Sequence, residues 1–117
     1  MNKTSNILQL LPLQQGYECP VVVESVRGGM PYIEVPYIIS EDEGLYTWFG
    51  IMMRKHDYHY RGLVDAIIAL KYDMSESFAV LLNYMDDPNN EHYKAEYDEF
   101  QSWRKQAKEY AKNHFNL

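Results

Sequence analysis

The sequence predicts a small α+β domain, because its character changes part-way along the chain. Between residues 20 and 39, β-branched side chains form two runs on either side of Gly28 and Gly29, which is typical of a β-hairpin. From residue 40 onward, apolar residues recur at the three- and four-residue spacing of amphipathic helices. We therefore expect an N-terminal arm and a β-hairpin covered by three to four helices, with a long amphipathic helix at the C-terminus.

The first 18 residues have no clear periodicity. They combine small polar side chains with a short leucine-rich stretch, and we expect either a packed terminus or an arm that docks on a neighbouring subunit. The remaining residues, 19–117, have the length and composition of a single small α+β domain. Pro36 cannot donate to a strand ladder, so the second run should be an edge strand or carry a bulge there.

The first helix is predicted to follow Ser40. Ser40 and Glu43 have the spacing of a capping box, and Leu45, Phe49 and Met52 recur at helical intervals, so a helix is expected from residue 40 to about 56. Next, the apolar run 63–70 predicts a buried helix, although a run of this length also allows a strand.

Two further helices are predicted beyond residue 72. Asp73 or Ser75 can cap the first of them, which carries apolar residues at helical spacing and ends at Pro88; these residues are Phe78, Leu81, Leu82 and Met85. Asn89 or Asn90 can cap the second, which is expected to reach about Asn113. In that last helix the acidic residues precede the basic ones, as the helix dipole favours.

Composition limits the environment and the partners. The chain has 117 residues, a formal charge of −6, and only one cysteine, Cys19, which favours a reducing, cytoplasmic compartment. No apolar stretch approaches the roughly 20 residues of a membrane span, and Tyr17 and Glu18 before Cys19 do not fit a processed leader. The acidity is concentrated in residues 41–88, so nucleic-acid binding is unlikely and a basic protein partner is favoured.

Three groups of residues carry possible chemistry, although each has a simpler explanation. His56 and His59 are weak candidates for metal ligands, but no further ligand pair lies at a usual spacing. Cys19 with a histidine would suit a thiol enzyme, yet a small apolar cysteine before a β-run is usually structural. The basic and aromatic segment 54–61 could contact nucleic acid. A metal-dependent or thiol enzyme and a nucleic-acid-binding module therefore remain alternatives, while no cofactor is expected.

Tyrosine is the most unusual feature of the composition, at 11 of 117 residues. Phenol rings supply large contact area with few rotatable bonds, and each buried hydroxyl needs a partner, so a small domain should expose several of them. We therefore predict a non-enzymatic protein-binding accessory protein, such as a phage or mobile-element inhibitor of a host protein or an assembly component; homo-oligomerisation is an open alternative. The predicted contact residues are Tyr58, Tyr60, Arg61, Tyr93, Tyr97, Trp103, Tyr110, Glu41, Asp42, Glu43, Asp86 and Asp87.

Overall fold

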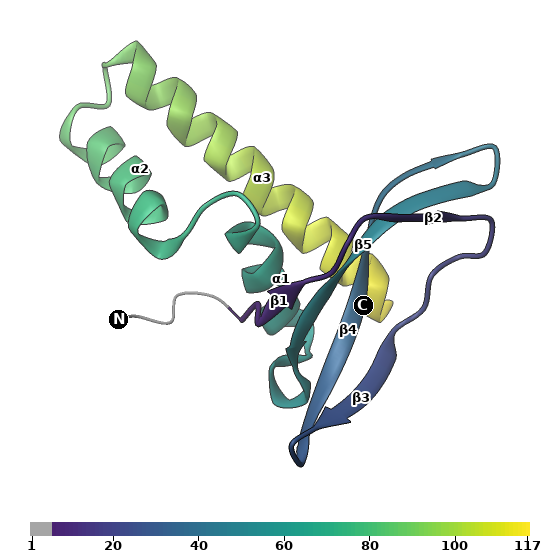
Figure 1. The fold of residues 1–117 in the computed structure, drawn as a ribbon. Coiled ribbons are helices and arrows are strands. Elements are labelled where there is room, and N and C mark those ends of the chain that lie inside the picture. Colours follow the sequence, from purple (N-terminus) through teal and green to yellow (C-terminus); the bar gives the residue numbers. More distant parts are fainter. Residues whose placement is uncertain (1–5) are drawn as a thin grey trace. The chain divides into compact units, whose positions relative to one another are not determined.

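The computed structural model describes residues 6–117 and shows a mixed α+β protein with a five-stranded antiparallel sheet and three α-helices. The chain folds as two compact units (Figure 1). Residues 6–58 form the sheet unit, and residues 59–117 form the helical unit.

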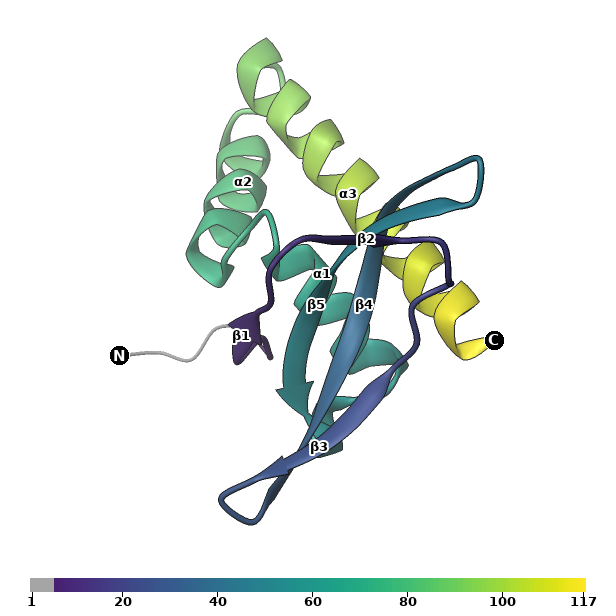
Figure 2. The same ribbon diagram turned by 45° about the vertical axis from the view of Figure 1, so that its right-hand side comes forward.

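The sheet unit contains all five strands. They are β1 (Gln9–Leu10), β2 (Gln14–Gly16), β3 (Val23–Arg27), β4 (Met30–Asp42) and β5 (Leu45–Arg54), arranged in the order β1-β5-β4-β3 with β2 also paired to β5. The long β4 and β5 run side by side through the middle of the sheet (Figure 2). Every pair in the sheet is antiparallel, as short connections between neighbouring strands allow.

The N-terminal segment pairs along the outer edge of β5. Leu10 lies opposite Ile51 and Gln14 lies opposite Trp48, so one extra residue is accommodated between β1 and β2. Between these two short strands, the backbone N–H of Leu11 donates to the carbonyl oxygen of Gly50 at 2.8 Å. The part of the predicted arm or packed terminus within residues 1–5 lies outside the described residues.

The hairpin predicted around Gly28 and Gly29 is confirmed. Both glycines have positive φ, 57° and 79°, and Arg27 pairs with Met30 across this two-residue turn. The β3–β4 ladder ends at the pair Val23–Glu34. Pro36 lies beyond this pair, so no backbone N–H is required from it for pairing with β3. The irregularity in register falls between Ile38 and Ser40 instead.

The helix predicted from residue 40 to 56 is wrong. β4 continues to Asp42, the chain turns at Glu43 (φ 52°) and Gly44 (φ 88°), and β5 returns alongside β4. Ser40 pairs with Thr47 and does not cap a helix. The strand is favoured because this two-residue turn suits antiparallel strands and because β5 supplies aromatic and β-branched residues that pair with β4.

Helical structure in the sheet unit is limited to one short turn. The 3-10 helix η1 (Lys55–Asp57) follows β5, and the backbone N–H of Tyr58 donates to the carbonyl of Lys55 at 3.0 Å. The buried cross-strand pairs that form the core of this unit are Ile33 with Met53 and Val35 with Ile51, on one face of the sheet.

The helical unit contains α1 (Tyr60–Ala69), α2 (Met74–Asp86) and α3 (Glu91–Phe115), with α1 and α2 both packed on α3. These are the three helices predicted after residue 60. Asp73 caps α2 through a complete capping box with Glu76, and Asn90 caps α3 by accepting from the N–H of Tyr93 at 3.1 Å. The core of this unit consists of Leu63, Val64, Ala66, Ile67, Phe100, Trp103, Ala107 and Ala111.

Within residues 6–117, none of the helices combines the length and apolar character needed to cross a membrane.

Candidate functional site

The predicted contact residues near the middle of the chain have different structural roles. Tyr58 ends the sheet unit, whereas Tyr60 and Arg61 lie in the first turn of α1. Between them, His59 caps α1, because its Nδ1 accepts a hydrogen bond from the backbone N–H of Gly62 at 3.1 Å. Burial raises the pKa of the Tyr58 hydroxyl above its ordinary value, so this side chain stays a neutral donor over the physiological range.

Tyr60 and Arg61 line a cavity of about 330 Å³ between α1 and α3, which we call the basic pocket. Its remaining lining residues are Val64, Asp65, Ile68, Arg104 and Lys108. The lining therefore includes three cationic side chains, Arg61, Arg104 and Lys108, and one carboxylate, Asp65. Arg104 is held in place by a hydrogen bond from its Nη1 to Oε1 of Gln101 at 2.8 Å. In the sequence, Arg104 and Lys108 are explained as basic residues that complement the dipole of the last helix. The sequence alone does not show that Arg61 of α1 lies beside them in the fold.

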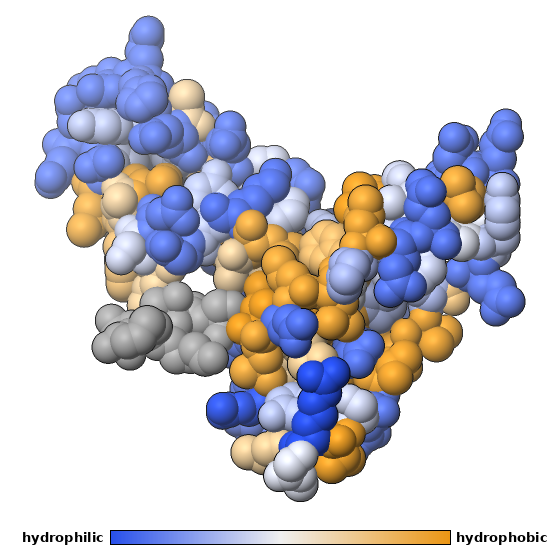
Figure 3. Space-filling model, viewed as in Figure 1, coloured by the Kyte–Doolittle hydropathy of each residue, from blue (hydrophilic) through white to orange (hydrophobic). Residues whose placement is uncertain are grey.

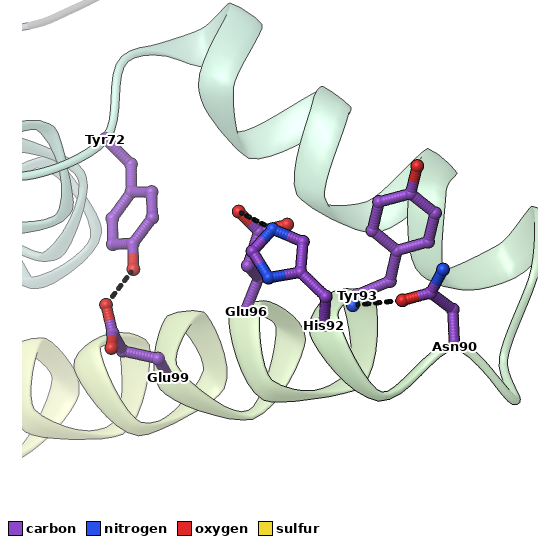
Figure 4. Close-up of polar contacts among 6 residues, drawn as sticks. All are labelled: Tyr72, Asn90, His92, Tyr93, Glu96 and Glu99. Carbon is purple, nitrogen blue, oxygen red and sulfur yellow. Dashed lines mark hydrogen bonds and ion pairs between the residues drawn. The ribbon is translucent and has the colours of Figure 1, made fainter.

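A second cavity of about 330 Å³ lies between α2 and α3, and we call it the acidic pocket. The hydroxyl of Tyr72 donates to Oε1 of Glu99 at 3.4 Å, and Nε2 of His92 lies 3.6 Å from Oε2 of Glu96 (Figure 4). Burial, together with the neighbouring Glu99 carboxylate, raises the pKa of Tyr72. The Tyr72 hydroxyl links the segment before α2 to α3, whereas the His92–Glu96 contact and the Asn90 cap both belong to α3 itself, so these contacts are explained as structural bonds.

The two weak metal candidates, His56 and His59, make other contacts in the structure. His59 uses Nδ1 to cap α1, and Nε2 of the exposed His56 lies 3.5 Å from Oδ1 of Asp57. Within residues 6–117, no group of three or more His, Cys, Asp or Glu side chains is placed to hold an ion. Cys19 is exposed.

The aromatic residues predicted as contacts on α3 divide into core and surface. Trp103 is only 7% exposed, its Nε1 donates to the carbonyl oxygen of Ile68 at 3.3 Å, and it therefore belongs to the core. Tyr97 stacks on Tyr84 of α2, with ring centroids 4.1 Å apart and planes 12° apart. Tyr93 and Tyr110 are half-buried, so part of each ring remains accessible.

The predicted acidic contact residues are all exposed, and each group lies at the end of an element. Glu41 and Asp42 end β4, and Glu43 lies in the turn that follows. Asp86 is the last residue of α2, and Asp87 follows it. These carboxylates are available to a partner.

The most exposed apolar surface of the helical unit lies on α2, and the sequence analysis did not identify it. Met74, Phe78, Leu82 and Met85 are 52%, 57%, 57% and 73% exposed. Successive helix residues are turned by about 100°, so these four side chains share about 80° of the helix circumference; we call them the α2 stripe. Apolar side chains gather on the surface of α2 (Figure 3). The opposite side of α2 faces α3, where Val80 lines the acidic pocket and Tyr84 stacks on Tyr97.

Carboxylates surround the α2 stripe. Asp73 and Glu76 lie at its N-terminal end, and Asp86 and Asp87 lie at its C-terminal end, while the sequence contains no lysine or arginine between residues 73 and 87. An apolar stripe with an acidic rim is thus combined in one unit with a basic pocket. No protein-family model, curated protein or solved structure matches this chain.

Proposed function

We propose that this chain is a non-enzymatic protein-binding protein, and that α2 docks in an apolar groove with a basic rim on another protein. The observation that carries the proposal is the α2 stripe, in which four large apolar side chains on one side of a single helix are each more than half exposed. A helix of this kind matches the helix-in-groove mode of recognition, in which apolar residues three and four positions apart act as anchors.

The size of the stripe indicates how much of the affinity it can supply. Full burial of a Leu, Phe or Met side chain contributes about 1.5–3 kcal/mol, and the stripe residues are already about half covered, so each gains about 1 kcal/mol on docking. Four such gains correspond only to about millimolar affinity, even before the costs of association. Additional contacts are therefore needed.

Charge provides the first of these contacts. Four carboxylates and no cations lie within residues 73–87, so this surface attracts a partner with lysine or arginine around its groove. Such pairs at an exposed rim mainly accelerate association and select the partner, and salt weakens them. Asp86 and Asp87, which the sequence analysis assigned to partner binding, form part of this rim.

The other predicted residues remain proposed contacts. They are the exposed carboxylates Glu41, Asp42 and Glu43 on the sheet unit, together with Tyr58, Tyr60, Arg61, Tyr93, Tyr97 and Tyr110. Small size, acidity and an exposed anchor helix suit an inhibitor of a host protein or an assembly component, such as those of a phage or mobile element.

The proposal is tested by capture from a lysate of the native host with three tagged proteins. The first is the unaltered chain, and the second carries Phe78→Ala with Leu82→Ala, which preserves helix propensity while removing two anchors. The third is a control carrying Val21→Ala with Val26→Ala, two apolar positions of the sheet unit that are even more exposed than Phe78 and Leu82, at 73% and 65% against 57% for each anchor. We expect one protein to be captured by the unaltered chain and by the control, and to be lost from the α2 variant.

Purified components then establish direct binding. A synthetic peptide of residues 73–87 should compete with the chain for the captured protein, and added salt should weaken the complex. Equal capture by all three tagged proteins would contradict the proposal. A solution mass of twice the chain mass that Phe78→Ala with Leu82→Ala reduces to one chain would also contradict it, because the occupant of the stripe would then be a second copy.

A further inference from the structure

We propose that the basic pocket binds the phosphoryl group of a small phosphorylated ligand. Arg61 from α1 and Arg104 and Lys108 from α3 all line this cavity, with Asp65 as the only carboxylate among its lining residues. The proposal goes beyond the proposed protein binding and shares Tyr60 and Arg61 with its additional contacts, but it uses no residue of the α2 stripe, so the stripe and the pocket can fail independently.

The charge of the pocket is not balanced by the protein. Neither Arg61 nor Lys108 makes an ion pair with a carboxylate within residues 6–117. Three cations and one carboxylate leave an excess of positive charge in a chain whose net charge is −6. A phosphate monoester carries a charge of about −1.5 to −2 at neutral pH, which would compensate this local excess.

The number of donors favours phosphate, because two guanidinium groups and one ammonium offer more N–H groups than the two oxygens of a single carboxylate can accept. Each guanidinium presents a planar fork of N–H donors that can bind two oxygens at once, and the lysine ammonium adds a compact point charge. The hydrogen bond from Arg104 Nη1 to Gln101 orients one of these forks before a ligand arrives, while its other N–H groups remain available. The tetrahedral oxygens of a phosphate can meet donors that approach from both helices.

The shape of the site favours a small molecule over a polymer. At about 330 Å³ the cavity is comparable with the smaller ligand pockets of proteins, and Tyr60, Val64 and Ile68 supply apolar wall next to the charges. A nucleic acid would extend well beyond this cavity over a chain that is acidic overall and would be repelled by it. The expected ligand therefore carries one or two phosphoryl groups and ends within or just outside the pocket.

Calorimetric titration of the full chain with pyrophosphate, ATP and citrate tests the assignment. The three probes are compared at matched ionic strength and pH. We expect both phosphate compounds to bind and citrate to bind at least about tenfold more weakly, because each planar carboxylate offers two oxygens whereas one tetrahedral phosphoryl group offers three to donors from both helices. Tighter binding of ATP than of pyrophosphate would assign the phosphoryl group to a nucleotide, and the reverse would assign it to a free phosphate.

Charge-matched variants connect any binding to this pocket. Lys108→Gln and Arg61→Gln should each weaken pyrophosphate binding about tenfold, since each removes a charge-assisted hydrogen bond. Lys105→Gln removes the same charge from an exposed position of α3 outside the pocket, and should change the affinity less than about twofold. Asp65→Asn should tighten binding, because it removes the one repelling carboxylate.

Three results would overturn the proposal. They are the absence of binding by either phosphate compound at millimolar concentration, citrate binding as tightly as pyrophosphate, and Lys105→Gln weakening binding as much as Lys108→Gln. The last result would show general attraction to surface cations. Circular dichroism of each variant, compared with the unaltered chain, shows whether an effect on binding reflects loss of the fold.

Discussion

The indole Nε1 of Trp103 donates a hydrogen bond to the backbone carbonyl oxygen of Ile68 at 3.3 Å, and this bond joins α3 to the C-terminal end of α1. The same oxygen accepts from the backbone N–H groups of Lys71 and Tyr72, at 3.1 and 3.0 Å. Lys71 also places its Nζ 4.3 Å from the centroid of the Trp103 ring. Ile68 and Arg104, which follows Trp103 in the chain, both line the basic pocket. The bond between Trp103 and Ile68 therefore helps to hold the α1 and α3 sides of the pocket together.

Two substitutions separate the hydrogen bond of Trp103 from its packing. Trp103→Phe removes the donor but leaves the Ile68 carbonyl with two backbone partners, so we expect a loss of about 1 kcal/mol in the free energy of unfolding. Trp103→Ala also leaves a cavity in the core and should cost about 3–5 kcal/mol. Urea unfolding followed by circular dichroism measures both, and a loss below about 1 kcal/mol for Trp103→Ala would contradict the core position.

The turn between β4 and β5 can be tested by whether a single substitution, Glu43→Gly, raises or lowers the stability of the chain. Glu43 has a φ of 52°, a conformation that costs a non-glycine residue about 1 kcal/mol. Glu43→Gly should therefore stabilise the chain by up to about 1 kcal/mol in thermal unfolding. If residue 43 instead belonged to a capped helix, the same substitution would remove its capping box and lower the stability.

The sequence permitted both structures in this region, which explains why the helix prediction failed. Ser40 and Glu43 have capping-box spacing, and the apolar residues from Leu45 to Met53 fit a helical period as well as a strand buried on both faces. The decisive interactions are non-local, such as Val35 with Ile51 and Ile33 with Met53 across the sheet. By contrast, Asp73 and Asn90 specify the starts of α2 and α3 through local caps, and those helices were predicted correctly.

Gly50 and Leu11 form a close contact that depends on the missing side chain of glycine. A Cβ added at Gly50 would lie 2.9 Å from Cδ1 and 3.3 Å from Cβ of Leu11. Gly50→Ala should therefore force the Leu11 side chain out of its present position and destabilise the chain by about 1–3 kcal/mol, as overpacking does.

A double-mutant cycle tests whether Leu11 is the residue that makes Gly50→Ala destabilising. In a Leu11→Ala background, Gly50→Ala should cost at least about 1 kcal/mol less, because the flexible end of the leucine is gone. Chemical unfolding of the four proteins measures the cycle. Additive effects would show that Leu11 is not the residue that excludes a side chain at position 50.

His114 should make the stability of the chain depend on pH. Burial lowers its pKa below the ordinary value of 6.5, so between the folded and ordinary values the unfolded chain binds a proton that the folded chain does not. The contribution of neutral His114 to the free energy of unfolding is complete above pH 6.5. It is lost as the pH falls from 6.5 through the pKa of His114 in the folded chain. His114→Gln should therefore lose less stability than the unaltered chain between pH 7.5 and about 5, and parallel stability curves would contradict this expectation.

The surfaces proposed for binding were only partly accessible from the sequence. Asp86 and Asp87 were identified by their acidity, and Tyr60 and Arg61 by the aromatic and basic break that contains them. The α2 stripe was missed because Phe78 and Leu82 have the spacing of a packed helical face, whereas in the structure Val80 and Tyr84 make the contacts to α3. Arg104 and Lys108 were missed as pocket residues because their neighbour Arg61 is distant in the sequence.

The most direct test of the central claim is the dissociation constant of the captured protein for the unaltered chain and for Phe78→Ala with Leu82→Ala, measured with purified components. A loss of about 1 kcal/mol for each truncated anchor predicts about thirtyfold weaker binding, with the control Val21→Ala and Val26→Ala unchanged. Equal dissociation constants for the unaltered chain and the α2 variant would contradict the claim that α2 is the binding surface.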